Sequence, residues 1–141
     1  MFSTSHIHPM VVHFPIALIM VGFLFEFVSL FLKKEPCFSK TALYLMVLGT
    51  LGAGVALTSG YLFTSALTEG EVAKIYIWHR TGAIIALIIM TIACTVRIYV
   101  AKKTSSPLKW IAFGLYFLGT LAISFTGFMG GTMVYKYILD M

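Results

Sequence analysis

The sequence predicts an all-α membrane protein, a four-transmembrane-helix up-down bundle that forms a single domain over residues 1–141. Of its 141 residues, 60% are hydrophobic and only 11% are charged, which is too little polar surface for a soluble domain of this size. Four segments also contain the ~18 apolar residues that a membrane span requires. The four spans occupy the chain and leave no room for a soluble domain.

The first helix is predicted at about residues 9–32. Pro9 suits the first helical position, where the missing N–H group is not needed. Pro15 lies one turn further in and frees the carbonyl group of Val11, so either a kink or a late helix start is expected. The helix ends at Lys33-Lys34-Glu35-Pro36-Cys37, where Pro36 prevents it from continuing.

The other helices are predicted at about residues 40–67, 72–101 and 107–137. In the second, Gly52, Ala56 and Gly60 recur every four residues, a spacing at which small side chains let a neighbouring helix approach closely in lipid. Interfacial tryptophans, Trp78 and Trp110, mark the third and fourth helices. A repeat of two hairpins is conceivable, but the halves show no clear sequence match.

The loop charges predict the orientation of the bundle. Lysines flank the first and third loops, whereas the second loop, with Glu69 and Glu71, is net acidic. Because positively charged loops stay in the cytoplasm, both termini and the second loop are expected on the outer, periplasmic side (N-out/C-out).

The four histidines lie at this outer side. His6, His8 and His13 stand at the mouth of the first helix, and His79 lies near the start of the third. These two helices are parallel diagonals of an up-down bundle, so His13 and His79 can face one another across its axis. Two such imidazoles suit axial ligation of haem, or a smaller metal ion. The alternative, that each histidine is only an interfacial anchor, remains open.

Three further residues of the predicted spans are candidates for a role: Arg80, Glu26 and Arg97. Arg80, directly after His79, is either a partner for haem propionates or a snorkelling cation. Glu26 and Arg97 lie at similar depth toward the cytoplasmic side. A bare carboxylate there is costly, so Glu26 is expected to face the bundle interior or to form a structural ion pair with Arg97.

The stretch His8-Pro9-Met10-Val11-Val12-His13-Phe14-Pro15 and the ending Gly130-Gly131-Thr132-Met133-Val134-Tyr135 resemble the opening and closing motifs of domain-of-unknown-function family 2231. The resemblance extends over the whole chain and implies a four-helix protein of the bacterial inner (cytoplasmic) membrane. It implies that His8, His13 and His79 are the family's histidines. Fusions of some relatives to Rieske-type or c-type cytochrome domains imply electron transfer at the outer face. Many relatives have a histidine where this chain has Tyr137, which argues against a ligand from the fourth helix.

The function predicted from these observations is a membrane electron-transfer module that resembles a b-type cytochrome. Haem b would be held by His13 and His79, with His8 as a supporting or alternative ligand and Arg80 beside it. Covalent c-type attachment is excluded, because the chain has no CxxCH motif.

Two alternatives remain open: a copper or zinc site built from His6, His8, His13 and His79, and an accessory or structural subunit of a larger respiratory complex. An electron carrier or accessory subunit is expected rather than an enzyme. The expected partners are the lipid bilayer and a periplasmic cytochrome c, a Rieske-type protein or a respiratory complex. Nucleic acid is not expected, because the basic residues belong mostly to two short loops.

Overall fold

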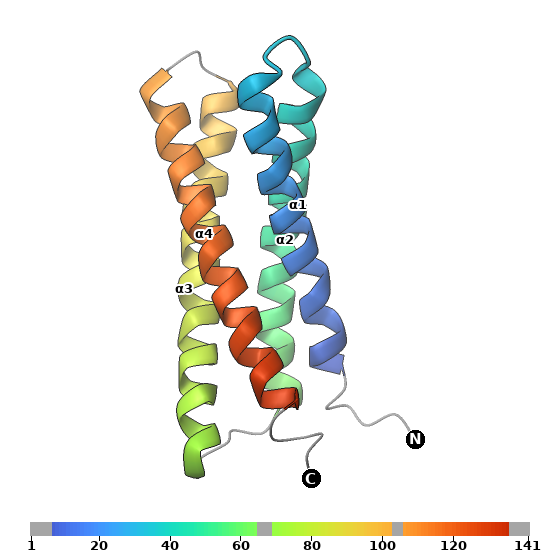
Figure 1. The fold of residues 1–141 in the computed structure, drawn as a ribbon, viewed down its shortest axis with the longest axis vertical. Coiled ribbons are helices and arrows are strands. Elements are labelled where there is room, and N and C mark those ends of the chain that lie inside the picture. The colour runs from blue at the N-terminus through green and yellow to red at the C-terminus, as the bar shows by residue number, and fades with distance from the viewer. Residues whose placement is uncertain (1–6, 65–68, 103–105, 136–141) are drawn as a thin grey trace.

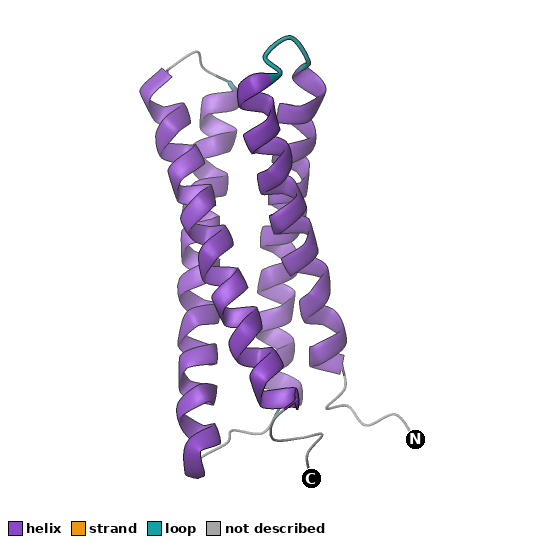
Figure 2. Ribbon diagram, in the orientation of Figure 1, coloured by secondary structure: helices purple, strands orange, loops and turns teal. Residues whose placement is uncertain are grey.

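The computed structural model describes residues 7–64, 69–102 and 106–135. They form four long helices that run alternately up and down (Figure 1): α1 (Ile7–Phe31), α2 (Pro36–Phe63), α3 (Gly70–Ala101) and α4 (Ser106–Met133). Each helix is long and apolar enough to cross a membrane. Within the described ranges, only short loops interrupt the helices and no strand is present (Figure 2). The predicted all-α four-helix bundle is therefore confirmed.

The helix boundaries differ from the predicted ones at two prolines. α2 begins at Pro36 and not near residue 40, because proline is well accommodated in the first turn of a helix. The same residue thus ends the first loop and begins the second helix. α1 begins at Ile7 and continues through Pro15, whose side chain is fully buried, so the late start considered from the sequence does not occur. The predicted ends at residues 67 and 137 lie outside the described ranges.

The bundle consists of two hairpins. α1 packs along the length of α2, and α3 along α4, while smaller contacts between α2 and α3 and between α1 and α4 join the hairpins. Small residues on α2 permit the close approach of α1: a Cβ atom on Gly49 would lie 2.6 Å from Ile19 Cγ1, and one on Gly52 would lie 3.3 Å from Pro15 Cβ. Gly49 and Gly52 thus belong to the packing face of α2 toward α1.

The two hairpins correspond position by position. Inward-facing positions of α1 have counterparts in α3 that lie 71 residues later in the chain: His8 and His79, Ile19 and Met90, Glu26 and Arg97. Positions of α2 have counterparts in α4 at a spacing that is one residue shorter than the 71 residues between α1 and α3: Met46 and Tyr116, Gly49 and Gly119, Gly60 and Gly130. The hairpins also run in the same direction (Figure 1). A pseudo-twofold axis therefore runs along the bundle, and equivalent residues meet across it.

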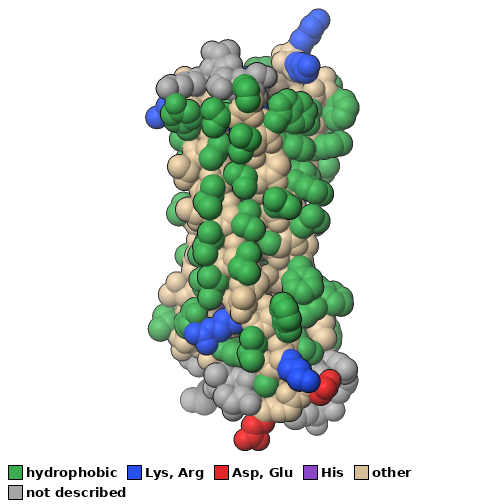
Figure 3. All heavy atoms as spheres, turned by 90° about the vertical axis from the view of Figure 1, so that its left-hand side faces the viewer, with side chains coloured by type: hydrophobic (Ala, Val, Ile, Leu, Met, Phe, Trp, Pro, Cys, Tyr) green, Lys and Arg blue, Asp and Glu red, His purple; other side chains and the backbone are tan. Residues whose placement is uncertain are grey.

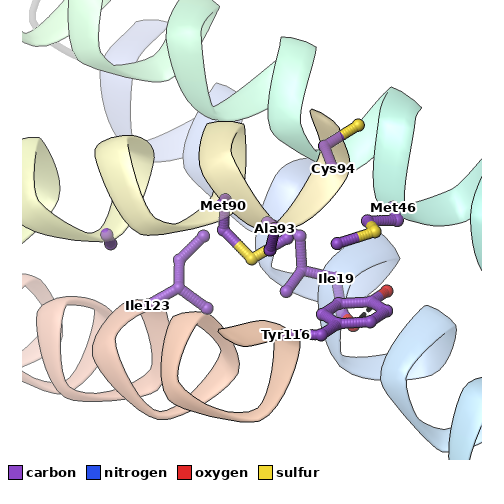
Figure 4. Close-up of a cluster of buried hydrophobic side chains, with 8 residues drawn as sticks. Ile19, Met46, Met90, Ala93, Cys94, Tyr116 and Ile123 are labelled. Atoms are coloured by element: carbon purple, nitrogen blue, oxygen red, sulfur yellow. Dashed lines mark hydrogen bonds between the residues drawn. The ribbon is translucent and has the colours of Figure 1, made fainter. Parts of the chain in front are cut away.

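One buried layer closes the middle of the bundle. Ile19, Met46, Met90 and Tyr116, one from each helix, reach toward one another and are at most 1% exposed (Figure 4). The Tyr116 hydroxyl group donates a hydrogen bond to the carbonyl oxygen of Ile19 (3.2 Å) and fills the space that Gly22 leaves by lacking a side chain. This layer separates the half of the bundle that contains the histidines from the half that contains Glu26 and Arg97.

The surface has the distribution of a membrane protein. On the face shown in Figure 3, hydrophobic side chains cover the middle of the bundle, and the charged side chains lie at its two ends. Many large apolar side chains of the described residues are exposed, as expected where lipid rather than water is the solvent. The chain is thus a multi-pass membrane protein in contact with the bilayer.

Candidate functional site

A cavity of about 520 Å³ opens between the helices at the end where α1 and α3 begin. Its volume lies within the range of cofactor and ligand sites. Much of its wall consists of residues with little or no side chain: Ala53, Ala56, Gly60, Ala83, Ala86, Gly127, Gly130 and Gly131. On the inner side it reaches Ile123, which belongs to the buried core cluster. The space therefore exists because small residues of α2, α3 and α4 face it.

Two histidines face each other in this cavity. The ring centroids of His8 on α1 and His79 on α3 are 6.3 Å apart, and the ring planes are inclined at 78°. The two residues are equivalent under the pseudo-twofold relation, and each side chain is partly buried. The diagonal helices thus bring together two imidazoles that are 71 positions apart in the chain.

Hydrogen bonds fix the orientation of both rings. His79 Nδ1 lies 2.9 Å from the carbonyl oxygen of Thr126. A carbonyl oxygen only accepts, so this nitrogen carries the proton. His8 Nδ1 lies 2.9 Å from the Ser59 hydroxyl oxygen, and that hydroxyl group donates its own hydrogen to Ala56 (2.8 Å). Each Nδ1 therefore donates a hydrogen bond, and Nε2 is then the nitrogen that can bind a ligand, as in metal-binding histidines.

A glycine lies directly against each ring. A Cβ atom on Gly60 of α2 would lie 3.1 Å from His8 Cε1, and one on Gly130 of α4 would lie 3.0 Å from His79 Cε1. Any larger residue would require the imidazole to move. In each hairpin, the second helix therefore positions the histidine ring of the first helix, through its glycine and through the hydrogen bond to Nδ1.

The remaining predicted site residues lie at the rim of the cavity or outside the described ranges. The His13 side chain is exposed, and its Nδ1 bonds to the carbonyl oxygen of Pro9 one turn earlier (2.6 Å). The ring that meets His79 thus belongs to His8 and not to His13. Arg80 is exposed at the cavity mouth, where its Nε donates to the Tyr61 hydroxyl group (3.0 Å). His6 and Tyr137 lie outside the described residues.

Glu26 and Arg97 form a buried ion pair on the other side of the Tyr116 layer. Arg97 Nε donates to Glu26 Oε1 (2.9 Å), and Arg97 Nη2 donates to Glu26 Oε2 (3.1 Å). Nη2 also donates to the Ser39 hydroxyl group (2.6 Å). The side chains of the pair are only 10% and 12% exposed. The carboxylate is thus paired across the bundle axis, which is one of the two arrangements expected for it.

The fold and the family comparison agree. A family model described as a predicted membrane protein, DUF2231, matches residues 4–141, almost the whole chain. The chain belongs to the DUF2231 family. Neither a curated protein nor a solved structure matches it.

Helical periodicity could have selected His8 in this DUF2231 protein. His8 precedes Glu26 by 18 residues, and His79 precedes Arg97 by the same number. This distance corresponds to about five turns, so each histidine lies on the same helix face as the ionisable residue that must face inward. His13 does not share that face, because 13 residues correspond to about 3.6 turns. Helix face therefore distinguishes His8 from His13 in the sequence itself.

Among the described residues, the DUF2231 site has the facing imidazoles of His8 and His79, and the His13 ring also lines the cavity. Among residues 7–64, 69–102 and 106–135, no three His, Cys, Asp or Glu side chains gather as a metal-ligand group. Structural zinc sites usually have four protein ligands and catalytic ones three. Two imidazoles on opposite sides of a cavity are what a haem with two axial histidines requires.

Proposed function

We propose that this protein is a membrane electron-transfer module of the b-type cytochrome kind, in which His8 and His79 hold haem b. The observation that supports this function most is the facing pair of imidazoles, each with Nδ1 hydrogen-bonded within its own hairpin, which leaves Nε2 as the nitrogen to ligate. Haem iron bound by two histidines supplies one-electron chemistry.

The residues around the histidines fit a flat, largely apolar group. Gly60 and Gly130 lie against the ligand rings and leave no side chain over them. Alanine and glycine residues line much of the remaining wall. Such a wall excludes water, and a low local dielectric favours the less charged form of a redox centre. The chain's own contribution is thus ligation, ring orientation and exclusion of water.

The charges support a bacterial inner-membrane location with the cavity open to the outer side. Lys33, Lys34 and Lys40 flank the loop between α1 and α2, at the end of the bundle opposite the cavity. The cavity end contains Glu69 and Glu71. By the positive-inside rule, the histidine site would exchange electrons with a periplasmic cytochrome c, a Rieske-type protein or a larger respiratory complex.

Haem titration tests the proposal. Apoprotein in neutral detergent is titrated with haem b, and binding is followed by the Soret absorbance. Wild-type protein is expected to bind one equivalent, whereas His8→Ala and His79→Ala should weaken binding at least tenfold. His13→Ala is the matched control from the same helix end, because His13 also lines the cavity but is exposed, with its Nδ1 bonded to Pro9 of its own helix. It is expected to bind haem like the wild type.

Two results would overturn the proposal. The first is the absence of a Soret change on titration of wild-type protein, together with a colourless preparation from haem-replete cells. The second is equal binding by wild-type, His8→Ala and His79→Ala proteins. Metal analysis of the same preparations would reveal a copper or zinc site, the alternative that uses the same histidines.

A further inference from the structure

The interior of the cavity is pseudo-symmetric, but its rim is not. Arg80 on α3 corresponds to Pro9 on α1, and Tyr61 on α2 corresponds to Gly131 on α4, by the same spacings that relate the hairpins. All four residues line the cavity. One side of the rim therefore has a cation and a phenol group, where the equivalent positions on the other side have a proline and a glycine.

Arg80 is held in place at this rim. Its Nε donates to the Tyr61 hydroxyl group (3.0 Å), and its guanidinium carbon lies 4.3 Å from the centre of the Tyr61 ring. Tyr76 lines the cavity beside it and also interacts with the guanidinium. The guanidinium has five N–H groups, so the contacts with the two tyrosines leave donors for a ligand.

The charge of Arg80 has no carboxylate partner in the described part of the chain. The ion pairs there are Lys74–Glu71 and Arg97–Glu26. An arginine held at the mouth of a ligand cavity without a counter-ion is suited to a carboxylate, which it binds through two parallel hydrogen bonds.

We infer that Arg80, held by Tyr61, binds the carboxylate groups of the molecule in the cavity and thereby fixes its orientation. The inference rests on the proposed function, and it defines the ligand class as a metal macrocycle with carboxylate arms. The two histidines ligate from equivalent positions and do not distinguish one orientation about the pseudo-twofold axis from the other. Arg80 does, because it occurs on one side only.

Esterified haem separates this role from a structural one. Apoprotein of the wild type and of Arg80→Gln is titrated in neutral detergent with haem b and with haem b dimethyl ester, whose propionates are neutral. Loss of a charged hydrogen-bonded contact should weaken haem b binding by about 10- to 100-fold in Arg80→Gln. Binding of the ester should differ less than twofold between the two proteins. Lys74→Gln, an exposed lysine of the same helix, is the control and should change neither affinity.

Each outcome decides the inference. An equal loss of affinity for both ligands in Arg80→Gln would assign Arg80 a structural role. No loss of affinity for either ligand would make Arg80 a snorkelling cation. Both results overturn the inference but leave the proposed haem binding intact. A loss that occurs only when anionic lipid is added would identify a lipid headgroup as the partner of Arg80, and it would also overturn the inference. If the wild type binds neither ligand, the proposed function itself fails.

Tyr61→Phe, which keeps the ring but not the hydroxyl group, should reduce the affinity for haem b and leave the affinity for the dimethyl ester unchanged.

Discussion

Removal of one member of the Glu26–Arg97 pair should destabilise the protein far more than removal of both. The pair is bidentate, and its side chains are only 10% and 12% exposed. In Glu26→Gln the guanidinium stays buried with only Ser39 as a strong partner. At an effective dielectric constant of about 20, opposite charges in contact attract by about 4 kcal/mol. Leaving one buried charge unpaired costs about 3–5 kcal/mol.

The double variant Glu26→Gln/Arg97→Met removes the unpaired charge. Uncharged side chains of similar size often replace a buried pair with little loss of stability. We therefore expect the double variant to lie within about 1–2 kcal/mol of the wild type, so that its loss is far smaller than the sum of the two single losses. The comparison uses the free energy of unfolding from equilibrium titration with sodium dodecyl sulfate in mixed micelles.

The exposed pair Lys74–Glu71, 3.9 Å apart, is the matched control. Glu71→Gln should leave the stability unchanged, because solvent-exposed pairs contribute little. Additive losses in the double variant, or a loss below about 1 kcal/mol in Glu26→Gln, would show that the two charges are not coupled across the bundle axis.

Three further changes test the packing and the ligand site. Gly130→Ala should lower haem affinity because its Cβ atom would lie 3.0 Å from His79 Cε1, whereas Gly114→Ala, with no neighbour within 4 Å, should not; haem titration compares them. Gly22→Ala should destabilise the fold by about 1–3 kcal/mol through overlap with the Tyr116 hydroxyl group, and Tyr116→Phe should recover part of that loss in unfolding titrations. Acidification should weaken haem binding, because protons compete for Nε2 of both histidines; affinity that stays constant down to acid pH would contradict histidine ligation.

The fold could be predicted from the sequence because length and hydropathy determine it. Four apolar segments separated by short loops allow few arrangements in lipid, since every backbone polar group must be satisfied inside a helix. The helix starts were less predictable, because Pro36 can both end one helix and begin the next. Its position in a loop did not show which role it would take.

The candidate site depended on which face of α1 turns inward. His8 and His13 both lie in the first turns of α1, so their position along the helix did not separate them. The helix face does, because His8 lies on the side of α1 that also contains Glu26. The equivalence of the hairpins was equally hard to see, since several corresponding positions have unlike residues, such as Met46 and Tyr116. Only the packing of the four helices shows that these positions are structurally equivalent.

Electron paramagnetic resonance of the ferric protein tests the central claim most directly. Two imidazole ligands make haem iron low-spin, and loss of one ligand makes it high-spin. The account predicts a low-spin spectrum for the wild type and for His13→Ala, and a high-spin spectrum for both His8→Ala and His79→Ala. A low-spin signal that persists in His8→Ala but disappears in His13→Ala would contradict it and would make His13 the ligand on α1.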